Sequence, residues 1–193
     1  MRVRDDSKII KIQDATIKII NEYGIGSATM QKISKEAGIA GGSIYTYYED
    51  KHDMLNKVFL SVEKEFSEYT LNAFDESKTV KENFYSIWEA LYKFSKENEA
   101  KYQFIETLKR NPIIDEESRI EIHEYYGLLI NYIHKAKTDG VIINVPDSLI
   151  AVFSFFSIAH LIDCPVIEDC KIDESEYLDM AFKMAWNSIT CPL

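Results

Sequence analysis

The fold of this chain is decided by residues 29–51, which read TMQKISKEAGIAGGSIYTYYEDK. Two short stretches with helical spacing stand on either side of Gly38, and Thr29 occupies the position of a helix N-cap. We predict helices over residues 30–37 and 41–47, joined by a tight turn. Four apolar side chains are placed to hold the two helices at a fixed angle: Ile33, Ala37, Ile39 and Ile44.

The second of these helices begins unusually, with Gly41 and Gly42. Each glycine costs about 1 kcal/mol relative to alanine in a helix, so a use for the missing side chains is expected. A bare helix start lets phosphate approach the backbone amides. The hydroxyls of Ser43, Tyr45 and Thr46 can donate to phosphate oxygens or to base edges. The alternative is a plain helical hairpin with tyrosines in its core.

The rest of the chain also has helical character, since its 193 residues include only seven glycines and four prolines. Thr79 and Glu82 form a capping box, Asp50 is placed to cap a long helix, and Pro112 follows a helix end. We expect an all-α fold of about nine helices. Besides the two short ones, they cover residues 7–23, 50–74, 79–97, 98–111, 115–139, 147–162 and 173–190.

The last two predicted helices are apolar on more than one face. In the final helix only Asp179, Lys183 and Asn187 form a polar stripe. A surface helix of one domain needs a single apolar face, so a second molecule is the expected cover. We predict a homodimer through these two helices, as a four-helix bundle about a two-fold axis. The alternative is that both helices form the central core of a monomer.

Charge is distributed unevenly along the chain, whose formal net charge is −10. Residues 1–52 hold eight Lys/Arg and seven Asp/Glu, and the remainder holds the other fourteen and twenty-five. A near-neutral N-terminal part can approach phosphates that the acidic remainder repels. No apolar stretch is long enough to span a bilayer, and Cys164, Cys170 and Cys191 show no paired spacing. We expect a cytoplasmic protein with free, structural thiols, and redox sensing by Cys164 and Cys170 is the lesser alternative.

Residues 37–54, AGIAGGSIYTYYEDKHDM, closely resemble the recognition-helix pattern of the TetR family of transcription regulators. Ala15, Ile19, Ile20 and Gly24 also fall at family positions, so the resemblance covers about residues 10–55. It implies a three-helix helix-turn-helix DNA-binding domain over 1–52 and a ligand-binding and dimerisation domain over 53–193. It further implies a dimeric repressor whose affinity for a palindromic operator falls when a small molecule binds.

The resemblance implies a DNA-contact role for nine residues: Thr29, Gln31, Gly41, Gly42, Ser43, Tyr45, Thr46, Tyr47 and Lys51. Thr29, Tyr45, Thr46 and Lys51 would contact phosphates. Tyr48 replaces the usual phenylalanine and is expected in the core. Ala40 and Gly41 replace polar residues of the family pattern, so base readout is expected to rest on Gln31, Ser43, Tyr47 and DNA shape.

The resemblance also implies a cavity in the C-terminal domain, and we expect an apolar or aromatic effector there. Its expected lining residues are Trp88, Phe104, Leu108, Tyr125, Tyr126 and His160, with ordinary core packing as the alternative role of each. The four histidines show no metal-site spacing, and no catalytic motif or phosphate loop occurs. We therefore expect no enzyme activity, cofactor or metal. The rival functions are a helical enzyme and a protein- or ligand-binding module without sequence-specific DNA binding.

Overall fold

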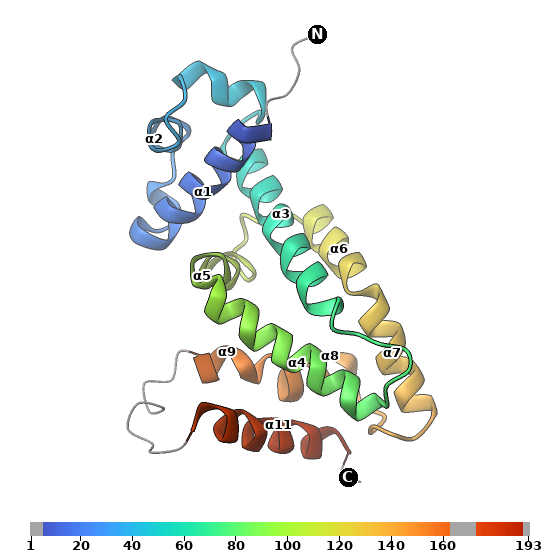
Figure 1. Ribbon diagram of the computed structural model, residues 1–193. Coiled ribbons are helices and arrows are strands. Elements are labelled where there is room, and N and C mark those ends of the chain that lie inside the picture. The colour runs from blue at the N-terminus through green and yellow to red at the C-terminus, as the bar shows by residue number, and fades with distance from the viewer. Residues whose placement is uncertain (1–5, 163–172, 191–193) are drawn as a thin grey trace. The chain divides into compact units, whose positions relative to one another are not determined.

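The computed structural model describes residues 6–162 and 173–190, and all regular structure in these ranges is helical (Figure 1). The predicted all-α fold is confirmed. The chain divides into two compact units. The head unit comprises residues 6–65 and 98–124, and the body unit comprises residues 66–97, 125–162 and 173–190. The predicted functional division at residue 52 falls inside one long helix and stays a prediction.

The head unit is built from α1 (Asp6–Tyr23), η1 (Ile25–Ser27), α2 (Met30–Glu36), η2 (Gly41–Thr46), most of α3 (Lys51–Leu71), α5 (Glu99–Leu108) and α6 (Glu116–Tyr125). Helix α3 starts where it was predicted, because the Asp50 carboxylate accepts the backbone N–H of Asp53 at 2.9 Å. A buried asparagine, Asn56, joins α3 to the loop before α6. Helices α5 and α6 lie in the same compact unit as α1, α2 and most of α3.

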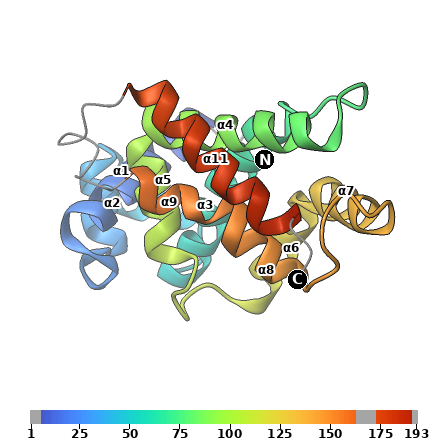
Figure 2. The ribbon, with the colours of Figure 1, turned by 90° about the horizontal axis from the view of Figure 1, so that it is seen from below.

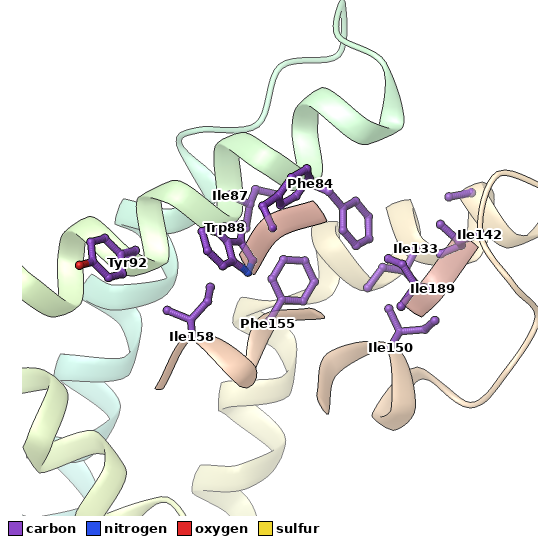
Figure 3. Packing of buried hydrophobic residues seen from close by; sticks show 12 residues of the cluster. Phe84, Ile87, Trp88, Tyr92, Ile133, Ile142, Ile150, Phe155, Ile158 and Ile189 are labelled. Carbon is purple, nitrogen blue, oxygen red and sulfur yellow. The ribbon is translucent and has the colours of Figure 1, made fainter. Parts of the chain in front are cut away.

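The body unit contains α4 (Val80–Glu97), α7 (Gly127–Thr138), α8 (Asp147–Ile150), η3 (Ala151–Phe155), α9 (Ser157–Ile162) and α11 (Glu174–Thr190). The predicted capping box opens α4: the backbone N–H of Thr79 donates to Glu82 at 2.8 Å, and the backbone N–H of Glu82 donates to the Thr79 hydroxyl at 3.3 Å. The core of the unit is mostly aromatic and isoleucine side chains, with Trp88 and Phe155 at its centre (Figure 3).

Two predicted helices are interrupted. The single helix expected over 115–139 is wrong, because Tyr126 has φ −95° and ψ 8° and separates α6 from α7. The break falls beside Gly127, where helix propensity is low. The single helix expected over 147–162 contains the π turn η3 between α8 and α9, where the N–H of Phe156 reaches the carbonyl of Ala151 at 2.8 Å.

Among the described helices, none is long and apolar enough to cross a membrane. The three cysteines, Cys164, Cys170 and Cys191, lie outside the described residues, so their predicted roles stay predictions.

Candidate nucleic-acid interface

Helix α2 is fixed at both ends by local interactions. At its start the Thr29 hydroxyl accepts the backbone N–H of Lys32 at 3.2 Å, which confirms the predicted cap. At its end Gly38 has φ +65°, a left-handed conformation that favours glycine. The N–H of Ile39 then reaches the carbonyl of Ser34 at 3.0 Å, closing a Schellman turn. The turn directs the chain straight into the next helix.

The second helix of the pair forms as a six-residue 3-10 helix, η2, instead of the expected α-helix over 41–47. Its glycine-rich start has low α-helix propensity, which suits the tighter winding. Ile44 anchors it in the core of the head unit and Tyr48, which follows it, is buried as predicted. Of the nine predicted DNA-contact residues, six are exposed: Thr29, Gln31, Gly41, Gly42, Tyr45 and Thr46.

The glycines at the start of η2 are not required by the chain itself. Neither Gly41 nor Gly42 has a positive φ. A β-carbon at Gly42 would meet nothing within 4 Å, and one at Gly41 would lie 3.8 Å from the Ser34 hydroxyl, an ordinary contact. Space is therefore left open beside both glycines, and Tyr45 and Thr46 of the same helix are exposed.

The remaining three predicted residues, Ser43, Tyr47 and Lys51, are half-buried. Lys51 has a structural partner that the sequence did not reveal: its ammonium donates to the carbonyl of Ile25 at 2.7 Å and so ties the start of α3 to η1. A lysine has three N–H donors, so this bond leaves others for a phosphate. Tyr47 borders a pocket that it shares with Ile9, Gln13 and Ser61.

Lys32 and Tyr23 also lie in this region, although sequence reasoning did not select them. The Lys32 ammonium stands 3.7 Å from the centroid of the Tyr23 ring, a cation–π contact between α2 and the end of α1. Nearby, Lys18 pairs with Glu36 at 2.5 Å, and this hydrogen bond raises the pKa of the Lys18 ammonium. Neither contact has a signature in the sequence, because each joins residues from two different helices.

The predicted ligand-lining residues do not lie in one unit. Phe104 and Leu108 are fully buried in the head unit, where the Phe104 ring centroid is 6.4 Å from that of Phe59. Trp88 is 2% exposed in the core of the body unit, and its ring nitrogen donates to the carbonyl of Ser154 at 3.0 Å.

Three further lining predictions complete the set. Tyr125 and Tyr126 are half-buried at the break between α6 and α7. The His160 side chain lies outside the described residues. No group of three or more His, Cys, Asp or Glu side chains placed to hold a metal ion occurs in the part of the chain that the structure describes.

Comparison with known proteins covers nearly the whole chain. Residues 12–58 match the family described as bacterial regulatory proteins, tetR family, and residues 59–191 match the tetracyclin repressor-like C-terminal domain. An uncharacterized HTH-type transcriptional regulator from Haemophilus influenzae is 22% identical over 179 residues, covering 93% of this chain and 94% of the relative.

Solved structures give the same result. A TetR family transcription regulator from Marinobacter aquaeolei VT8 is 28% identical, with a TM-score of 0.89 and 98% of both chains covered. The transcriptional regulator FadR from Bacillus subtilis, solved in complex with stearoyl-CoA, is 23% identical, with a TM-score of 0.70 over 93% of this chain and 98% of FadR.

Proposed function

Because this chain belongs to the TetR family of DNA-binding transcription regulators, we propose that it is a cytoplasmic, homodimeric repressor without a catalytic step of its own. An apolar small molecule lowers its affinity for a palindromic operator. The observation that carries the DNA-binding part is the outer face of η2, where neither φ nor packing requires Gly41 and Gly42, and where Tyr45 and Thr46 are exposed.

The proposed contacts follow from the chemistry of that face. The bare start of η2 lets the backbone come close to the duplex, and Tyr45 and Thr46 donate hydroxyls to phosphates. Gln31, Ser43 and Tyr47 are the side chains proposed to reach base edges in the major groove. With so few long polar side chains, a large part of the specificity comes from DNA shape.

The test is operator binding to the chain's own upstream DNA, titrated across salt concentrations. Tyr45→Phe removes one exposed hydroxyl and is expected to weaken binding to all sequences. Lys51→Ala removes one positive charge proposed to contact a phosphate. It is expected to reduce the slope of log affinity against log salt concentration by about one. Tyr69→Phe and Lys93→Ala are the matched controls, a tyrosine of α3 that lies in the body unit and an exposed lysine of α4. Unchanged affinity and slope in both test variants would contradict the assigned contacts.

The proposed dimer surface lies on α8, η3, α9 and α11, which Figure 2 shows from below. Six large apolar side chains are exposed on it: Leu149, Val152, Phe153, Phe156, Met180 and Met184. Asp179 and Lys183 stand beside the two methionines on α11, so the surface carries both charges. A two-fold interface uses the same patch on both subunits, so a patch that carries an acid and a base offers charges that can pair across it.

Sedimentation of two charge-introducing variants tests the dimer. Phe153→Glu, at a side chain 57% exposed on η3, is expected to give monomers. Leu128→Glu, at a side chain 49% exposed on α7, is expected to leave the dimer intact. Operator binding should fail with the first variant alone, because two recognition helices must enter major grooves about 34–36 Å apart. A monomeric wild-type protein, or a dimeric Phe153→Glu variant, would contradict the proposed surface.

The proposed effector is apolar, in keeping with the aromatic side chains of the body unit and with the stearoyl-CoA bound by the Bacillus subtilis neighbour. Stearoyl-CoA is the first probe, and coenzyme A without the acyl chain is its control. The acyl form is expected to release the operator and coenzyme A to leave it bound. A ligand lowers DNA affinity only by its preference for the free protein, so equal affinity for free and operator-bound protein would exclude the mechanism.

A further inference from the structure

The proposed dimer surface is built on an irregular stretch of helix. Val152 and Phe153 lie within the π turn η3 and Phe156 follows it directly, and all three side chains are about half exposed. A π turn is rare in proteins and tends to occur at functional positions.

The π turn aligns two core residues that an ordinary helix would separate. Ile150 and Phe155 are five residues apart, which would place them about 140° apart around an α-helix. The i→i+5 winding brings them toward the same side, and both are buried in the core of the body unit (Figure 3). Phe155 stacks on Phe84 of α4, with ring centroids 5.2 Å apart. The same winding sets the direction in which Phe153 and Phe156 point outward.

The turn is held from inside by one residue of a different helix. The ring nitrogen of Trp88, on α4, donates to the carbonyl of Ser154 at 3.0 Å, and Figure 3 shows this nitrogen turned toward the segment that carries Phe155. The Ser157 hydroxyl donates to the same carbonyl at 3.1 Å. The Trp88 bond is buried, so breaking it would leave an indole N–H without a partner away from water.

We propose that Trp88 is a positioning residue for subunit association. Its hydrogen bond to the Ser154 carbonyl holds the π turn in the register that presents Val152, Phe153 and Phe156 to a second copy of the chain. This role rests on the proposed dimer surface. Trp88 itself touches no partner: it lies in the core of one subunit and acts through the backbone of η3.

The test compares the dimer dissociation constants of Trp88→Phe and of a control variant. Trp88→Phe keeps an aromatic ring and removes the N–H donor, and the dissociation constant is expected to rise about tenfold, the effect of losing one buried hydrogen bond. The control, Tyr132→Phe, also removes a hydrogen-bonding group from an aromatic side chain of the body unit: the Tyr132 hydroxyl, on α7 and outside the proposed dimer surface, accepts the side-chain N–H of Asn83 at 3.1 Å. We expect the control to change the dissociation constant by less than about threefold.

Thermal unfolding measured on both variants separates positioning from stability alone. A lower Tm for Trp88→Phe with an unchanged dissociation constant would overturn the proposal. Ser157→Ala removes the second donor to the same carbonyl and leaves the core intact. Ser157→Ala is also expected to raise the dimer dissociation constant. It therefore tests whether the bonds to the Ser154 carbonyl matter for association if Trp88→Phe fails to fold.

Phe153→Glu, measured in the same series, distinguishes the two possible failures. If it stays dimeric, the dimer surface and the role of Trp88 both fall. If it dissociates while Trp88→Phe and Ser157→Ala associate like wild type, only the role of Trp88 falls.

Discussion

The side-chain oxygen of Asn56 accepts the backbone N–H of Asp115 at 3.0 Å, which joins α3 to the first residue before α6. The amide nitrogen of the same side chain donates to the carbonyl of Ile113, also at 3.0 Å. Asp115 in turn caps α6, since its carboxylate accepts the N–H of Ser118 at 2.8 Å. This bond lowers the pKa of the Asp115 carboxyl. One buried asparagine thus connects α3, the helix that follows η2, to α6.

Asn56→Ala is expected to lower the free energy of unfolding by about 1–3 kcal/mol, because it leaves the Ile113 carbonyl and the Asp115 N–H without their partner. Urea unfolding followed by circular dichroism measures the change. Asn72→Ala, an exposed asparagine, is the control and should stay within about 0.5 kcal/mol of wild type. Equal midpoints for the two variants would show that the Asn56 bonds contribute nothing net.

The glycines at the two ends of α7 predict opposite effects of the same substitution. Gly127 has an ordinary φ and a β-carbon there would meet nothing within 4 Å, so Gly127→Ala should stabilise the protein by up to about 1 kcal/mol. Gly140 has φ +70° and follows the end of α7, with the N–H of Val141 bonded to the carbonyl of Ala136 at 2.9 Å. Gly140→Ala should therefore destabilise by about 1 kcal/mol. Thermal melts that shift in the same direction for both variants would refute this pair.

Acid should weaken the link between α7 and α8. The hydrogen bond with Lys137, joined by that with His134 at 2.7 Å, holds the pKa of the Asp147 carboxyl below its usual value despite partial burial. A carboxyl whose pKa is lower in the folded state than its unfolded value of ~3.9 stabilises the fold fully at any pH above that unfolded value. That stabilisation is lost as pH falls through the lower, folded value.

Asp147→Asn should therefore flatten the decline of Tm below about pH 4, because it removes one of the groups that must be protonated. Asp139→Asn, an exposed aspartate at the end of α7, is the control and should retain the wild-type decline. The idea is wrong if the two variants show the same slope.

Phe104 is expected to be a structural residue of the head unit. It is fully buried against Phe59, so Phe104→Ala should cost about 3–5 kcal/mol through lost contacts and a cavity. Ile120→Ala removes an exposed side chain in the same unit and should cost little. Chemical denaturation of both variants gives the comparison. A small loss at Phe104, with altered release by stearoyl-CoA, would instead support its predicted place in a ligand cavity.

Local signals in the sequence were sufficient to predict most helix ends and the turn between α2 and η2, although η2 forms as a 3-10 helix and not as the α-helix expected there. The Thr29 and Asp50 caps, the Gly38 turn and the Thr79–Glu82 capping box all form as predicted. Each depends on backbone groups within a few residues, so residue type and spacing determine it. The spacing of residues over about 10–55 was also sufficient to identify the family, because helix-turn-helix geometry is set over a short stretch of chain.

Tertiary structure alone decided where two predicted helices are interrupted and which distant groups the side chains bond to. Tyr126 ends one predicted helix and the π turn at Ala151 interrupts another, although the hydrophobic spacing runs through both. Lys51 bonds to Ile25, and Trp88 bonds to Ser154, 26 and 66 residues away. The sequence could not predict these features because a hydrophobic pattern indicates only which side of a helix is apolar. Which carbonyl a buried donor reaches depends on how distant helices pack.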